Sequence, residues 1–148
     1  MTQTELSSTT SASDLDLSAF WAGVQAVIQN YGSSIELKGA SAPTARSVSL
    51  GKSGWSIIAR LLERGTVGRV SLYLDGKNGR ANFDELLDKR DAIEADLGPL
   101  EWLSNDGKTT QACRLYALVR LNGNNTDIAG AQQWFAMQII AFYQRFAG

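Results

Sequence analysis

The order of strands around one long crossover most constrains what this chain can fold into. Apolar alternation and glycine-rich turns predict strands at 46–50, 55–62, 69–75, 100–104 and 109–121. Between the last two strands stands Asn105-Asp106-Gly107, a sequence typical of a hairpin turn. Strands joined by short turns must pair antiparallel, because a parallel connection needs about a dozen or more residues. Only the segment between the third and fourth strands is long enough for such a crossover.

Two of the predicted helices flank these strands. The first begins at Asp16 or Ser18, either of which can cap free backbone N–H groups, and ends at Gly32. The last begins at a cap on Asp127. Apolar residues recur at three- and four-residue steps along both. In the first helix they are Phe20, Trp21, Val24, Val27, Ile28 and Tyr31, and in the last Ile128, Trp134, Phe135, Ile139, Phe142 and Phe146.

The crossover itself is predicted to be one helix over 82–97. Asn82 can cap it, and Glu85 can reach back three residues, as in a capping box. Gly98 and Pro99 end it. One face of this helix carries the residues expected to meet the core, namely Phe83, Leu86, Leu87, Arg90, Ile93 and Leu97.

These elements predict an α+β fold in the order α-β-β-β-α-β-β-α. We expect an antiparallel or mixed sheet of about five strands, packed by three helices on at least one face. Residues 15–148 form a single domain in this prediction. Residues 1–14 are rich in serine and threonine and are predicted to be a flexible tail, and 33–43 to be a loop.

The composition excludes several kinds of catalytic and metal site. The chain has no histidine, the most frequent general base and transition-metal ligand. Its one cysteine, Cys113, stands in an apolar strand pattern and is predicted to lie in the core. We therefore expect no cofactor, no metal and no enzymatic activity. A net charge of −1 and a pI of about 5.4 disfavour a nucleic-acid binder, although a local basic patch stays open.

The N-terminus lacks the basic start and apolar stretch of a secretory signal. No apolar run approaches the roughly 20 residues that cross a membrane. The expected location is cytoplasmic.

Several segments together resemble one bacterial family, the domain of unknown function 4268. They are RVSLYLDGKN, FDELLDKRDAIEADLG, LEWL and QACRLYALVRL, with Trp134 in the last helix. The resemblance covers roughly residues 17–147. Longer members of the family carry a nuclease-like module before this domain, an arrangement that resembles restriction or defence proteins. The resemblance thus implies a fold and a defence-related setting, and it implies no reaction.

A metal-dependent nuclease is the enzymatic alternative. Restriction-type nucleases combine an acidic residue on one strand with a Glu or Asp two residues before a Lys on the next. Asp75-Gly76-Lys77 matches the second half, and Glu63 is the nearest acidic candidate for the first. The same DGKNGR sequence is, however, typical of a solvent-exposed turn.

Arginines and tyrosines predict an interaction surface on one side of the sheet. Arg60, Tyr73, Arg114, Tyr116 and Arg120 can gather on the outer face if no helix covers it. Arginine and tyrosine together suit a protein interface, and also phosphate contacts and base stacking. Cross-strand pairing with acidic residues would neutralise the same surface.

The tryptophans divide into two pairs. Trp21 and Trp134 lie on apolar helix faces and are predicted to be core residues. Trp55 and Trp102 stand beside turns and are expected to be more exposed, so they are the first candidates for a contact surface, although core packing is the favoured interpretation of each; Trp102 joins the candidate surface.

The leading functional hypothesis is a non-enzymatic protein-interaction domain linked to prokaryotic defence or phage–host conflict. Its expected partner is another protein, such as a nuclease or another defence component. The alternatives are a degenerate or minimal metal-dependent nuclease that uses Asp75 and Lys77, and a small phage inhibitor of a host defence complex.

Overall fold

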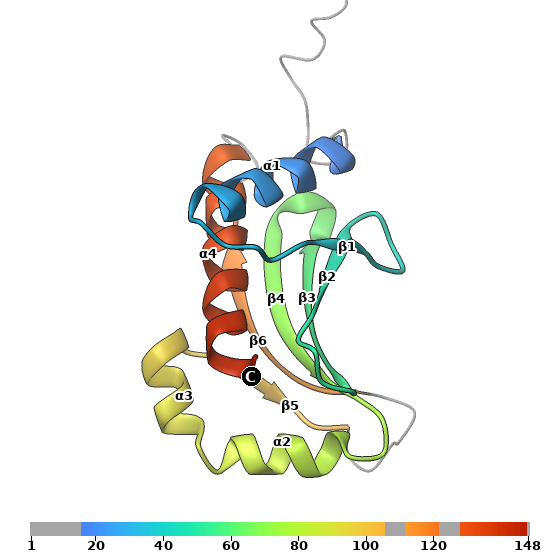
Figure 1. Cartoon of the computed structure of the whole chain (residues 1–148), viewed down its shortest axis with the longest axis vertical. Coiled ribbons are helices and arrows are strands. Elements are labelled where there is room, and N and C mark those ends of the chain that lie inside the picture. Colours follow the sequence, from blue (N-terminus) through green and yellow to red (C-terminus); the bar gives the residue numbers. More distant parts are fainter. Residues whose placement is uncertain (1–15, 106–111, 122–127, 148) are drawn as a thin grey trace, which may run out of the picture.

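The computed structural model describes residues 16–105, 112–121 and 128–147 (Figure 1). The elements are, in chain order, α1 (Leu17–Asn30), β1 (Lys38–Gly39), β2 (Ala45–Ser49), β3 (Trp55–Leu62), a 3-10 turn η3 (Glu63–Gly65), β4 (Val67–Leu74), α2 (Gly79–Leu87), α3 (Arg90–Leu97), β5 (Glu101–Leu103), β6 (Cys113–Arg120) and α4 (Ile128–Phe146). The predicted α+β class is confirmed.

The strands of the described residues form one six-stranded sheet in the order β1-β2-β3-β4-β6-β5. Every neighbouring pair is antiparallel, which decides between the two predicted sheet types. The crossover through α2 and α3 carries the chain from β4 to the far edge, and β6 then returns between β4 and β5. This return makes β4 and β6, which are far apart in the sequence, direct neighbours.

One face of the sheet, the inner face, packs against the helices. Alternate side chains of a strand point to the same side, and those of the inner face are buried: Ile57, Ala59, Leu61, Val70, Leu72, Leu74, Cys113, Leu115 and Ala117. In Figure 1, α1 crosses one end of the curved sheet, α4 runs beside the strands, and α2 and α3 lie at the other end. The predicted core position of Cys113 is confirmed.

Helix α1 begins where the sequence predicts. The carboxylate of Asp16 accepts a hydrogen bond from the backbone N–H of Ala19 at 3.0 Å, which caps the first turn. Phe20 and Trp21 contact Phe135 of α4 in edge-to-face geometry, with ring centroids 5.9 and 5.0 Å apart. Tyr31, predicted on the buried face, follows the last residue of the helix and is 55% exposed.

The predicted helix 82–97 is wrong in its start and in its continuity. Helix α2 already begins at Gly79, so Asn82 lies inside it and forms no capping box with the exposed Glu85. The chain then turns at Asp88, and α3 begins at Arg90. The predicted end at Gly98 is confirmed, with φ of 84°.

The break between α2 and α3 has a packing reason. Phe83 of α2 packs with the side chains on the inner face of the sheet, whereas α3 contacts α4 and buries Ile93. One straight helix could not serve both contacts. Consequently Leu87 and Arg90, predicted to face the core, are exposed at the break, while Leu86 and Leu97 are partly buried.

The described residues thus contain four α-helices and six strands, against three and about five predicted. The extra strand is β1, a two-residue edge strand in the segment predicted as a loop. Ile128, predicted on the apolar side of α4, is exposed in the first turn. The predicted tail 1–14, the Asp106-Gly107 turn, residues 109–111 and the Asp127 cap lie outside the described residues.

None of the helices in the described part of the chain combines the length and the apolar character that crossing a membrane requires.

Candidate functional site

The other face of the sheet, the outer face, carries the arginines and tyrosines that the sequence predicts to gather. Residues that stand opposite each other in an antiparallel pair point to the same side. The register therefore defines this face as Ser56, Ile58, Arg60 and Leu62 of β3, Val67, Arg69, Ser71 and Tyr73 of β4, and Arg114, Tyr116, Leu118 and Arg120 of β6. No helix of the described residues packs on it, because the helices pack with the inner-face side chains.

Two arginines of the outer face stack on its two tyrosines. Arg114 lies over the ring of Tyr73 at 5.6 Å, and its Nη1 donates a hydrogen bond to the Tyr73 hydroxyl at 2.8 Å. Arg69 lies over the ring of Tyr116 at 5.4 Å. Such stacking is a geometry that guanidinium groups favour. It holds both arginines against the sheet in defined positions.

The positive charges on this face repel one another. Burial is the first cause that lowers the pKa of Arg69, and the neighbouring charges of Arg114 and Arg60 lower it further. The two tyrosines act in the opposite direction. Arg69 thus stays a cation, as arginine does in proteins, but its charge is less favourable here than in water.

Carboxylates do not compensate these charges within the described residues. The ion pairs there join Lys38 to Glu36, Arg80 to Asp84, Arg90 to Glu94 and Arg145 to Asp96, and none of them includes an arginine of the three central strands. The Lys38–Glu36 pair lies at the edge strand β1, on the same side of the sheet as the outer face. Glu101 on the edge strand β5 stands opposite Tyr116 and is exposed. The cross-strand neutralisation considered from the sequence is absent from the central strands.

Buried donors and exposed leucines complete the outer face. Ser71 is fully buried, and its hydroxyl has no hydrogen-bond partner among the described residues. The Nε atoms of Arg69 and Arg114 are likewise buried without a partner there. Leu118 on β6 is 50% exposed, and Leu103 on β5 is 43% exposed. The surface is therefore cationic and aromatic at its centre, with aliphatic side chains beside it.

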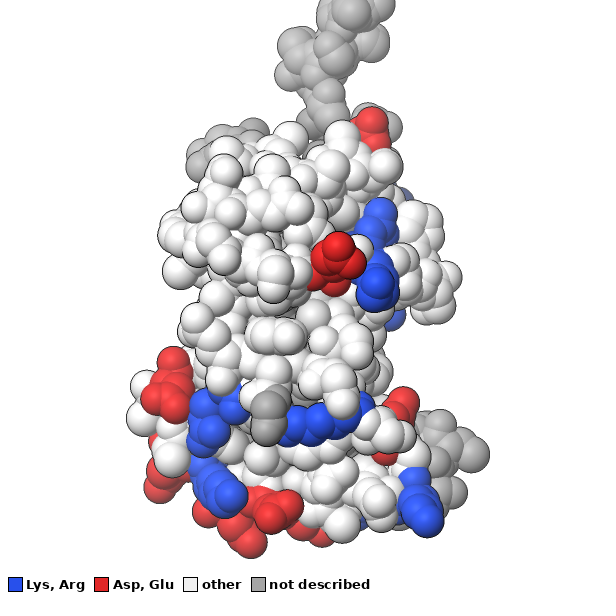
Figure 2. All heavy atoms as spheres, in the orientation of Figure 1, with Lys and Arg blue, Asp and Glu red and all other residues white. Residues whose placement is uncertain are grey.

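The opposite side of the molecule looks different. Figure 2 shows Lys and Arg mixed with Asp and Glu around α2 and α3, and almost no charge over α1 and α4. The sequence of α1 contains no charged residue, and α4 contains only Arg145. Four arginines gathered on three neighbouring strands thus distinguish the outer face from the helix side.

Trp102 does not belong to the outer face. It stands opposite Leu115 and so points to the inner side, where its ring packs edge-to-face on Phe83 with centroids 6.0 Å apart. Its indole N–H donates to the carboxylate of Glu94 at 2.9 Å. Trp102 is partly buried, as predicted, but its contacts hold α3 to β5.

The remaining tryptophans follow the sequence prediction closely. Trp21 is buried in the core and Trp134 is partly buried against it. Trp55 is partly buried at the start of β3, with the Lys52 ammonium 4.3 Å from its ring centroid.

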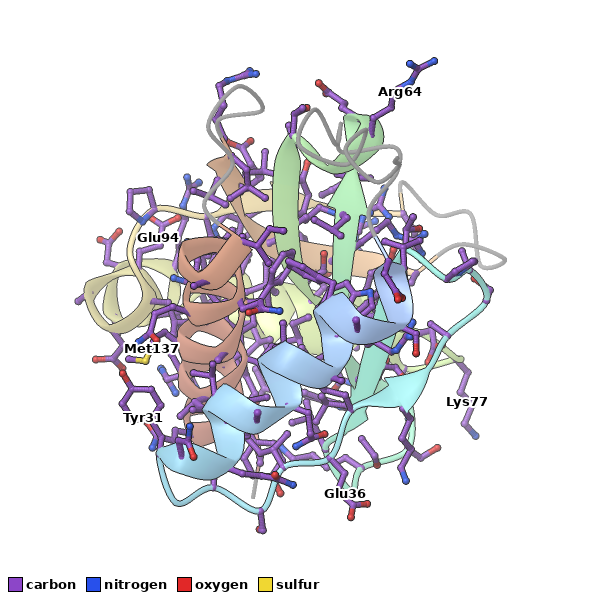
Figure 3. The ribbon with its side chains drawn as sticks, turned by 90° about the horizontal axis from the view of Figure 1, so that it is seen from above. Tyr31, Glu36, Arg64, Lys77, Glu94 and Met137 are labelled. Carbon is purple, nitrogen blue, oxygen red and sulfur yellow. The ribbon has the colours of Figure 1, made fainter. Side chains whose placement is uncertain are left out.

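The residues of the nuclease hypothesis lie apart. Asp75 and Lys77 are exposed in the turn after β4, and Gly76 between them has φ of 78°. Figure 3 shows Lys77 pointing away from the body of the molecule. Glu63 follows the end of β3, which is the opposite end of the same hairpin. Eight paired residues separate the two ends, roughly 25 Å at about 3.3 Å per residue, so Glu63 and Asp75 cannot bind the same ion. No group of three or more acidic or cysteine residues in the described chain is placed to hold a metal.

Sequence reasoning missed Arg69 as a member of the surface. Arg69, Ser71 and Tyr73 alternate along β4, and this shared parity was a usable signal. Their partners on β6 follow from the register.

Comparisons with known proteins leave one finding. Neither the curated proteins nor the solved structures contain a match to this chain. The family model described as Domain of unknown function (DUF4268) matches residues 18–148, which is nearly the whole chain. The chain therefore belongs to the DUF4268 family of domains of unknown function.

Proposed function

We propose that this chain is a non-enzymatic protein-interaction domain that docks its partner on the outer face. The observation that carries the proposal is a sheet face left open by the described helices, with four arginines and two tyrosines that lack a compensating carboxylate on the central strands.

The composition of the outer face supports a protein partner. Tyrosine and arginine are enriched in the centres of protein interfaces, whereas lysine, aspartate and glutamate are depleted there. Strands β3, β4 and β6 contain four arginines and two tyrosines and no lysine or acidic residue. The exposed Leu118 adds apolar area beside them.

The stacked arginines also support binding. A long side chain that is already fixed loses less conformational freedom when a partner docks. Arg114, held by the ring and hydroxyl of Tyr73, is such a side chain. The face is therefore prepared for contact before the partner arrives.

The setting that we propose is prokaryotic defence or phage–host conflict. It rests on the family resemblance, in which longer members place a nuclease-like module before this domain. A nuclease or another defence component is the partner that this setting favours.

A triple variant tests the proposal. We expect that Arg114→Ala, Tyr116→Ala and Arg120→Ala together abolish capture of a specific partner from the native host, because arginine and tyrosine are frequent hot-spot residues and truncation of a hot-spot residue costs about 2 kcal/mol or more. Affinity purification followed by mass spectrometry measures the loss.

The control variant combines Tyr31→Ala, Arg80→Ala and Lys89→Ala. It removes the same kinds of side chain, one tyrosine and two cations, at exposed positions: the end of α1, helix α2 and the break between α2 and α3. The proposal fails if the outer-face variant, shown to be folded by circular dichroism, captures its partner as well as wild type does.

A further inference from the structure

We infer that the partner bound at the outer face is an acidic protein segment, whose carboxylates pair with Arg60, Arg69 and Arg114 and whose aliphatic side chains cover Leu118. This inference rests on the proposed function and specifies the chemistry of the partner.

The charge arrangement favours binding of an anion from outside the central sheet. Arg60 and Arg69 stand directly opposite each other across β3 and β4, so two cations occupy one cross-strand pair. Like charges in that position destabilise a sheet. Arg114 also lies close enough to influence Arg69. A carboxylate placed among these three groups would relieve the repulsion and form charge-assisted hydrogen bonds.

No ion pair joins an acidic residue of the described chain to these arginines. Asp84 and Asp96 are held by Arg80 and Arg145 near the helices. Glu101 is on the edge strand β5, opposite Tyr116 and next to the strand that carries Arg114, but it forms no ion pair with Arg114, and β6 lies between it and Arg69. The missing counter-charge is therefore one that a partner can supply.

Three observations favour a protein over a nucleic acid. A guanidinium already lies over each tyrosine ring, at 5.4 and 5.6 Å, so stacking bases would have to displace or overlie an arginine. Leu118 and Leu103 are exposed beside the arginines and match aliphatic side chains better than phosphates. The chain has a net charge of −1 and no lysine on β3, β4 or β6, whereas nucleic-acid binders usually carry a basic excess.

Binding of defined probes to the full chain tests the inference. The probes are a fluorescein-labelled peptide rich in glutamate and leucine, its counterpart with glutamine in place of glutamate, and a single-stranded oligonucleotide of similar length. Fluorescence anisotropy measures each affinity. We expect the acidic peptide to bind at least about tenfold more tightly than either of the others. Its affinity should fall as NaCl rises from about 50 to about 300 mM, because salt screens charge pairs.

Matched variants localise the binding. Arg60→Gln, Arg69→Gln and Arg114→Gln together should weaken the acidic peptide about tenfold or more. The control is Lys77→Gln, Arg80→Gln and Lys89→Gln, which removes three exposed positive charges elsewhere and should leave the affinity within about twofold. If the first variant does not fold, Arg60→Gln alone replaces it, because Arg60 is not one of the arginines stacked on tyrosine, and we expect about a threefold loss.

Other outcomes overturn the inference. Tighter binding of the oligonucleotide would assign the face to nucleic acid. Self-association of the chain that the arginine variant abolishes would assign it to a second copy. Equal binding of the acidic and glutamine peptides, or no binding of either, would show that the outer face does not recognise carboxylates. If the triple alanine variant nevertheless loses the native partner, the proposed function stands and only the chemistry of the partner is wrong.

Discussion

At the scale of single residues, Glu94 fastens the end of α3 to strand β5. Its carboxylate accepts hydrogen bonds from the indole of Trp102 at 2.9 Å and from the backbone N–H of Leu100 at 3.1 Å. Arg90 donates from one turn earlier at 3.3 Å. The side chain of Glu94 is 23% exposed, so these bonds form at the margin of the core.

The same contacts make stability depend on pH. The hydrogen bond from Trp102 is the main cause that lowers the pKa of Glu94, assisted by Leu100 and Arg90 and opposed by burial. Because this pKa is depressed in the folded state, the unfolded chain binds the proton first as the pH falls. The Glu94 carboxylate therefore stabilises the folded state fully above the ordinary pKa of 4.5, and this stabilisation is lost as the pH falls through the folded-state pKa. We expect Glu94→Gln to lower the melting temperature at neutral pH.

Thermal unfolding followed by circular dichroism at several pH values checks this prediction. The difference between wild type and Glu94→Gln should be constant above about pH 5.5 and should shrink below about pH 4.5. Arg80→Gln, which breaks only an exposed pair with Asp84, is the control and should have little effect. A difference that stays constant at acidic pH would contradict the role of the Glu94 charge.

At the scale of elements, the turn from β4 into α2 depends on a glycine. A Cβ atom at Gly79 would lie 2.6 Å from the carbonyl oxygen of Leu74, and backbone cannot move aside as a flexible side chain can. Gly76, with φ of 78°, turns the chain just before it. This close approach lets α2 begin directly below the sheet and direct Phe83 into the core.

We therefore predict that Gly79→Ala destabilises the domain by about 2 kcal/mol, because the helix must shift away from β4. The matched control is Gly39→Ala, since a Cβ at Gly39 meets no atom within 4 Å; it should change the stability by less than about 0.5 kcal/mol. Urea unfolding of both variants provides the comparison. Equal stabilities would show that the turn tolerates a side chain.

The sequence predicted the existence of these elements better than their boundaries. The apolar spacing of Leu86, Leu87 and Ile93 continues across the break at Asp88, so periodicity alone predicts one helix. The break follows from contacts with two different parts of the fold, and such contacts leave no local signal. Asn82 and Glu85 have the spacing of a capping box, but α2 begins at Gly79, three residues before Asn82.

At the scale of the whole molecule, packing on one side explains the candidate site. The described helices cover the inner face, and the outer face carries the arginines and tyrosines of the central strands together with a few aliphatic side chains. Alternation along β6 was enough to predict Arg114, Tyr116 and Arg120 as one group. The insertion of β6 beside β4 was not predictable from local patterns, and it is this insertion that places Arg114 on Tyr73 and Tyr116 near Arg69.

The central claim is that the outer face is the docking surface, and site-specific photo-crosslinking in the native host tests it most directly. A photoreactive amino acid replaces either Leu118, 50% exposed on the outer face, or Met137, 43% exposed on α4. Since the two side chains are almost equally exposed, the positions differ mainly in the side of the molecule on which they would detect a bound partner. We predict a defined crosslinked protein from position 118 that is absent or much weaker from position 137. Crosslinking from position 137 and none from position 118 would contradict the account.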